Sequence, residues 1–75
     1  MTNNNNIYDT VRNNIRKYRR LKCMTQQELA DAAELSHGYI REIESLHMKS
    51  SFSLDAVEKI ATALNIEVKL LFEEE

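Results

Sequence analysis

The side chains best placed to do chemistry lie on one face of a short predicted helix, residues 37–45. Ile40 and Ile43 recur at the spacing of a buried helical face, which leaves the polar residues between them on the outer face. Imidazole, phenol, guanidinium and carboxylate groups can donate to or accept from nucleic-acid bases and phosphates. The outward residues are Ser36, His37, Tyr39, Arg41 and Glu42.

The sequence gives little support to other site chemistry. It has no glycine-rich phosphate loop, no triad-like set and no paired carboxylates of a cleft, so we expect no enzyme activity. His37 and His47 lack acidic or thiol partners at ligand spacing, so neither a metal site nor a cofactor is expected. The single cysteine, Cys23, excludes an internal disulfide bond.

Two short helices joined by a tight turn must position the polar face. Thr25 and Glu28 form a capping-box pattern at the start of the first, which should span Gln26 to about Ala33. Ser36 is the expected cap of the second helix. The small side chain of Ala30 permits the close backbone approach that a steep crossing needs. The pair is a helix-turn-helix candidate.

Three further helices complete the predicted fold. The first should run from about Tyr8 to Lys22, and a fourth should follow the cap Ser53 and stop at Asn65. A last short helix should cover about Glu67 to Phe72. The stripes predicted to be buried are Val11, Ile15 and Tyr18 in the first helix and Leu54, Val57, Ile60, Ala61 and Leu64 in the fourth.

Length and composition fit one small all-α domain. The 75 residues include one glycine and no proline, and no useful stretch alternates with a period of two. We expect a compact five-helix domain over residues 7–72, with a disordered arm over 1–6 and an acidic tail over 73–75. No apolar run is long enough for a membrane span and no signal peptide is visible, so the predicted location is cytoplasmic.

Charge is distributed unevenly along the chain. The net charge is −2, yet residues 1–24 carry six basic side chains against one acidic, and residues 25–75 carry four basic against eleven acidic. This asymmetry favours a surface that faces a polyanion and an acidic far side. A basic helix face that is only solvated is the alternative. The low total charge predicts modest affinity for non-specific DNA.

The sequence TQQELADAAELSHGYIREIE, residues 25–44, resembles the helix-turn-helix of phage repressors, Cro proteins and related small bacterial regulators. That family typically shows T-Q-x-x-L-A, a turn, an apolar residue, S, a variable pair, Y-I and then I-E. The likeness extends over about residues 11–72. Two positions depart from the family, which usually has glycine where this chain has Glu34 and often has it where this chain has Cys23. A left-handed Glu34 would cost about 1 kcal/mol.

The resemblance implies which residues meet double-stranded DNA. His37 and Gly38 would lie at the base edges, with Tyr39 and Arg41 towards the backbones. Glu42, one turn deeper, would be repelled by phosphates unless it accepts from cytosine or pairs with Arg41. The start of the second helix and the loop after the third would add backbone contacts. The further DNA-binding residues predicted there and at the cap are Gln26, Gln27, Ser36, Lys49 and Ser50.

In the same family, the arginine at the position of Arg19 pairs with the glutamate at the position of Glu44, tying the first helix to the end of the third. A partly buried carboxylate needs such a partner. One helix contacts only a few base pairs, so we expect a homodimer on a near-palindromic operator. The predicted dimer interface comprises Leu70, Leu71 and Phe72, whose alternative role is core packing.

The sequence is compatible with two functions. The leading one is a sequence-specific DNA-binding transcriptional regulator, a repressor or controller protein that occludes a promoter or contacts RNA polymerase. The alternative is a protein-interaction module that keeps the fold but has lost DNA binding. Glu42, Glu44 and the acidic composition after residue 24 favour the alternative.

Overall fold

Four α-helices and one 3-10 helix make up the part of the chain that the computed structural model describes, residues 6–45 and 51–74. The all-α prediction is confirmed there, since this part contains no strand. None of its helices is long and apolar enough to cross a membrane. The elements are α1 (Ile7–Leu21), α2 (Gln26–Ala33), α3 (His37–Glu44), α4 (Leu54–Leu64) and the 3-10 helix η1 (Val68–Phe72).

Polar side chains cap the start of every α-helix. The hydroxyl of Thr25 accepts from the backbone N–H of Glu28 at 3.0 Å, and the Glu28 carboxylate accepts from the N–H of Thr25 at 2.8 Å, so the predicted capping box is present. Ser36 and Ser53 cap α3 and α4 in the same way. Asn6, predicted to belong to the disordered arm, caps α1 instead. The rest of that arm, residues 1–5, lies outside the described residues.

In residues 6–45 and 51–74, three residues other than glycine take the left-handed conformation where helices end. Cys23 follows α1 with φ 59°, Glu34 follows α2 with φ 60° and Asn65 follows α4 with φ 59°. Cys23 and Glu34 stand at positions where the resembling family has glycine, and Asn65 is the residue at which the sequence predicts the end of α4. A side chain at such a position costs about 1 kcal/mol relative to glycine, less for asparagine.

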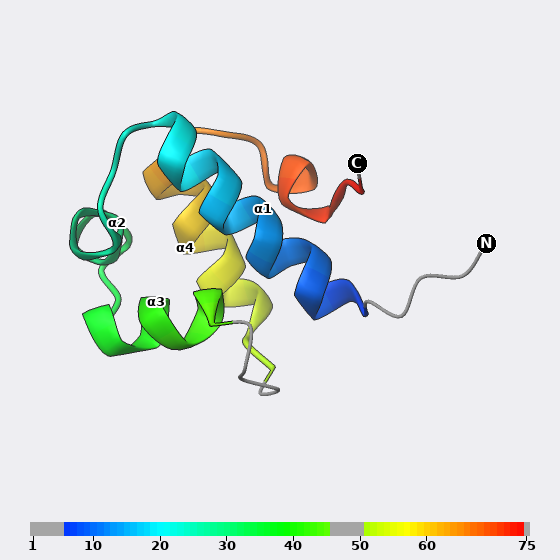
Figure 1. The fold of residues 1–75 in the computed structure, drawn as a ribbon, viewed down its shortest axis with the longest axis horizontal. Helices are drawn as coiled ribbons and strands as arrows, with labels where there is room; N and C mark the ends of the chain where they lie inside the picture. The colour runs from blue at the N-terminus through cyan, green and yellow to red at the C-terminus, as the bar shows by residue number, and fades with distance from the viewer. Residues whose placement is uncertain (1–5, 46–50, 75) are drawn as a thin grey trace.

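One core joins all five elements (Figure 1). Helix α1 crosses the body, α2 and α3 lie on one side of it, and η1 packs against α1 on the other. Leu54 departs from the predicted stripe, because its side chain is 74% exposed at the first position of α4, beyond the edge of the core. The core residues are Val11, Ile15, Leu29, Ala30, Ala33, Ile40, Ile43, Val57, Ile60, Ala61, Leu64 and Leu71.

The last predicted helix is a 3-10 helix and not an α-helix. The segment has five residues, and no described side chain caps its start at Glu67. Segments this short often take the tighter form. Its position is set by Asn14, a buried residue of α1, whose side-chain amide donates to the carbonyl oxygens of Leu71 at 2.9 Å and Glu73 at 2.8 Å.

Replacing Glu34 with glycine should stabilise the protein. Glycine takes φ of 60° without the side-chain penalty, so Glu34→Gly should raise the free energy of unfolding by about 1 kcal/mol in urea denaturation. Ala32→Gly is the matched control, because Ala32 is exposed within α2 and glycine there should lower stability by about 1 kcal/mol. A less stable Glu34→Gly variant would contradict the left-handed assignment.

Candidate nucleic-acid interface

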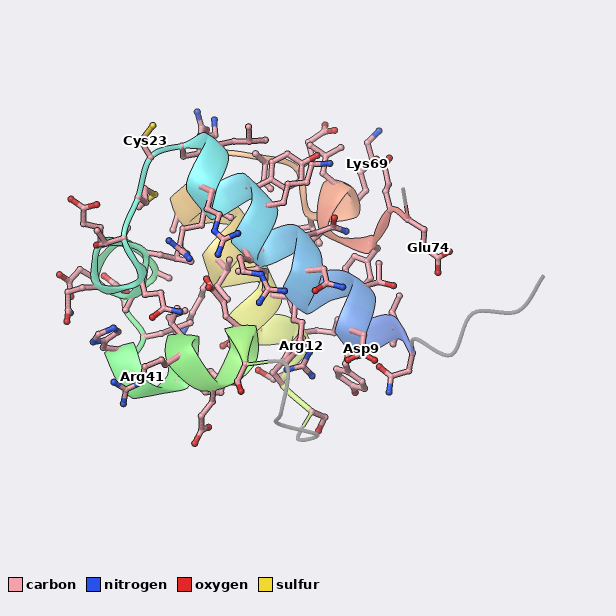
Figure 2. The ribbon with its side chains drawn as sticks, in the orientation of Figure 1. Asp9, Arg12, Cys23, Arg41, Lys69 and Glu74 are labelled. Atoms are coloured by element: carbon pink, nitrogen blue, oxygen red, sulfur yellow. The ribbon has the colours of Figure 1, made fainter. Side chains whose placement is uncertain are left out.

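Arginines from α1 bind the C-terminal end of α3. Arg12, only 2% exposed, donates through Nη1 to the carbonyl oxygens of Ile43 at 2.9 Å and Ser45 at 3.0 Å. Arg16 donates to the carbonyl oxygen of Glu44 at 2.8 Å. The last carbonyls of an α-helix have no partner within the helix, and α3 ends in an extended residue rather than a left-handed cap. The arginines therefore serve as the C-terminal cap of α3, and Figure 2 shows Arg12 beside that end.

Arg19 and Glu44 form a buried, two-pronged ion pair. Nε of Arg19 lies 2.7 Å from Oε2 of Glu44, and Nη2 lies 3.0 Å from Oε1. The Glu44 side chain is only 3% exposed, so its charge depends on these partners. Arg19 also donates to the carbonyl oxygen of Met24 at 2.8 Å. One arginine thus joins α1, the segment before α2 and the end of α3.

These bonds correct the interpretation of the basic N-terminal part of the chain. Arg12 and Arg16 are among the six basic residues that favour a surface facing a polyanion, but their guanidinium groups bind the protein's own carbonyl oxygens, and Arg19 forms the ion pair expected of it. Arg20 and Lys22 are exposed, at the far end of α1. Three of the six basic side chains before α2 therefore serve the fold.

The first two turns of α3 form the polar face that the sequence predicts. Ile40 is buried, whereas Arg41 and Glu42 are exposed, and Figure 2 shows Arg41 projecting from α3 away from the body of the protein. His37 is half-buried, and the partly buried Tyr39 packs against the core. Arg41 and Glu42 form no ion pair within the described residues, as expected of neighbours in a helix, which do not face each other.

Gly38 leaves an open place in this face. It is the only glycine of the chain, it lies in the first turn of α3, and its φ is not positive. A Cβ added there would meet no described atom within 4 Å. Glycine lowers helix stability relative to alanine, so the fold gains nothing from it. The missing side chain allows another molecule to approach the backbone of α3 closely.

The remaining predicted contact residues have different surroundings. Gln26, half-buried at the start of α2, donates through Nε2 to Oε1 of Glu44 at 3.1 Å. Gln27 is exposed and donates to Asp31 at 3.1 Å. The hydroxyl of Ser36 accepts from the N–H of Tyr39 at 3.0 Å. Lys49 and Ser50 lie outside the described residues.

The predicted dimer residues do not form one surface. Leu71 has no exposed surface and belongs to the core, so its side chain is not available to a partner. This happens because Asn14 holds the carbonyl of Leu71 and turns η1 onto α1. Leu70 and Phe72 are half-buried.

An apolar hollow that sequence reasoning missed lies near the end of α3. Its volume is about 290 Å³, and Ile7 and Leu54, two of the exposed large apolar side chains, are at its rim. The Tyr8 and Phe52 rings meet edge to face, with centroids 5.2 Å apart. One sequence signal for this hollow was available: Leu54, a large apolar residue, directly follows the cap Ser53 and is the first residue of its helix. The lining residues are Ile7, Tyr8, Val11, Phe52, Ser53, Leu54, Val57 and Phe72.

Comparison with known proteins agrees with this geometry. The helix-turn-helix family profile matches residues 15–71, more than half of the chain. The chain belongs to the helix-turn-helix family. Its fold is similar to the crystal structure of the restriction-modification controller protein C.AhdI from Aeromonas hydrophila. That match has a TM-score of 0.78 and 31% sequence identity, and covers 87% of this chain and 96% of the other. No curated protein matches significantly.

Family membership gives this helix-turn-helix protein its functional class, that of DNA-binding transcriptional regulators. The helices that form the motif are α2 and α3. In the described part of the chain, no group of three or more His, Cys, Asp or Glu side chains is arranged to hold a metal ion.

Removal of Arg19 should destabilise the helix-turn-helix. In Arg19→Met the buried carboxylate of Glu44 loses its charged partner, and we expect unfolding to become easier by about 3–5 kcal/mol in urea denaturation. Arg20→Met is the control, because the exposed Arg20 should contribute at most about 0.5 kcal/mol. Equal effects of the two substitutions would show that the ion pair does not hold the fold together.

Proposed function

We propose that this protein is a sequence-specific transcriptional regulator that binds near-palindromic double-stranded DNA as a homodimer, with the first turns of α3 in the major groove. The observation that carries the proposal is the asymmetry of α3. The backbone of its C-terminal end is bound by arginines of α1, whereas its outer face exposes Arg41, Glu42 and an open glycine position. The similarity to a restriction-modification controller protein supports a controller or repressor role.

The side chains of α3 divide the proposed recognition between them. His37 and Arg41 carry the donors that guanine and phosphate accept, and Gly38 lets the backbone come close to the base edges. Glu42 is exposed, so in the groove it would accept from the N4 amine of cytosine and disfavour other bases. Tyr39 has its ring partly in the core, which leaves its hydroxyl as the group for a phosphate. Ser36, Gln27, Lys49 and Ser50 are the proposed backbone contacts.

The apolar hollow is the proposed joint between two copies. Leu54 and Ile7 protrude at its rim, so a two-fold partner can insert the same side chains that it receives. Phe72, one of the predicted interface residues, lines the hollow. The hollow is next to the C-terminal end of α3, because Arg12 contacts that end and lies 5.8 Å from the centroid of Phe52. Pairing there would set two α3 helices side by side, as two half-sites of an operator require.

Binding at an operator would regulate transcription by covering a promoter or by contact with RNA polymerase. A cytoplasmic location is part of the proposal, since both the operator and polymerase are found there.

The DNA-binding proposal is tested by removing base-contacting side chains. His37→Ala and Arg41→Ala should each weaken binding to a selected operator by at least about tenfold, with unfolding midpoints nearly unchanged. Lys59→Ala is the matched control, because Lys59 is an exposed cation on α4, away from the proposed interface. Affinity for the operator should fall with added salt. Binding that shows neither sequence preference nor salt dependence would favour the protein-interaction module instead.

The dimer joint is tested with two exposed leucines. Leu54→Glu places a charge at the rim of the hollow and should convert the dimer to a monomer in analytical ultracentrifugation, lowering operator affinity. Leu21→Glu adds the same charge at the end of α1, where Leu21 is 66% exposed and does not line the hollow, and should remain dimeric. A dimer that survives Leu54→Glu would exclude the hollow as the joint.

A further inference from the structure

We infer that Glu44 is a positioning residue for DNA binding, because it orients the side-chain amide of Gln26 towards a backbone phosphate. This inference rests on the proposed function and assigns a step within it. Glu44 itself is buried and does not reach the DNA; it acts through Gln26.

The Glu44 carboxylate fixes which end of the Gln26 amide faces inward. A carboxylate oxygen only accepts hydrogen bonds, so the 3.1 Å contact with Oε1 of Glu44 requires the NH₂ group of Gln26 and not its oxygen. The same Oε1 accepts from Arg19 at 3.0 Å, and the second carboxylate oxygen accepts from Arg19 at 2.7 Å. Arg19 thus holds the carboxylate, and the carboxylate holds the amide.

Among the described residues the second N–H of the Gln26 amide has no acceptor, so it remains for a ligand. Gln26 is the first residue of α2, and the backbone N–H groups of the first turn have no acceptor within the helix. The hydroxyl of Thr25 takes the N–H of Glu28, which leaves those of Gln26 and Gln27. A side-chain donor beside two backbone donors matches a phosphate oxygen, which accepts only. An amide free to rotate would present its oxygen to the phosphate in part of the molecules.

A chain of contacts thereby joins the scaffold to the proposed DNA surface. It runs from α1 through Arg19 to Glu44 at the end of α3 and then to Gln26 at the start of α2. The ion pair that fixes the helices therefore also fixes the direction of one DNA-binding donor. Gln27, the neighbouring side-chain amide, is bound to Asp31 and does not compete for Glu44.

A double-mutant cycle in operator affinity separates this role from a purely structural one. Glu44→Asp keeps the negative charge but draws the carboxylate back by one methylene, away from both Gln26 and Arg19. Binding should weaken by about threefold to tenfold, the value of one hydrogen bond. Gln26→Ala should weaken binding by a similar factor. In the Gln26→Ala background, Glu44→Asp should cause no further loss of affinity, although it should lower the unfolding midpoint equally in both backgrounds.

An equal loss of affinity from Glu44→Asp with and without the Gln26 side chain would overturn the inference and leave the proposed function intact. Absence of any operator preference in the wild-type protein would overturn both.

A second measurement needs no variant at Glu44. In NMR spectra of the free wild-type protein, one Nε2 proton of Gln26 should exchange slowly with water because it is bound to Glu44. Addition of operator DNA should then shift the other proton. Two Nε2 protons that exchange equally fast in the free protein would overturn the inference, and assignment of the pair by its disappearance in Gln26→Ala is the control.

Discussion

The position of α3 depends on its contacts with α1, which are made by the last residues of α3. A helix of eight residues is marginal in isolation, so its position must come from tertiary contacts. Ser36 binds the first turn, and Arg12, Arg16 and the Arg19–Glu44 pair bind the last one. Every strong polar contact of α3 beyond its cap is therefore at the C-terminal end. Within the described residues, the exposed side chains of Arg41 and Glu42 form no ion pair with the rest of the protein, and this outer face is the one proposed to meet DNA.

The bonds made by these arginines leave the surface of this acidic chain with fewer cations than the sequence suggests. Buried ion pairs add little net stability, but they strongly disfavour arrangements in which a partner is lost. Arg12, Arg16 and Arg19 bind oxygens of the protein itself, which leaves seven of the ten Lys and Arg residues to neutralise phosphates. Non-specific affinity should be low, and discrimination should come from the shape of α3 and from residues such as Glu42.

Local sequence patterns predicted the features that depend on near neighbours. The caps at Thr25, Ser36 and Ser53 and the left-handed stop at Asn65 follow from residue type and position, and the structure has all four. Tertiary geometry decided the rest. Arg12 is one of six basic residues before α2, and nothing in the local sequence indicates that its guanidinium binds carbonyls 31 and 33 residues away. Leu54 was predicted to be buried and is exposed, whereas Leu71 was predicted to lie at a dimer interface and is buried. An apolar side chain near the end of a helix can face either way.

The most direct test is a map of backbone amide chemical shifts during titration with duplex DNA. If α3 enters the major groove, the shift changes should concentrate at residues 26–27 and 36–42. The amide shifts of η1 and of the buried half of α1 should change little. Shifts concentrated at η1 and around the apolar hollow, with α3 unaffected, would contradict that placement of α3.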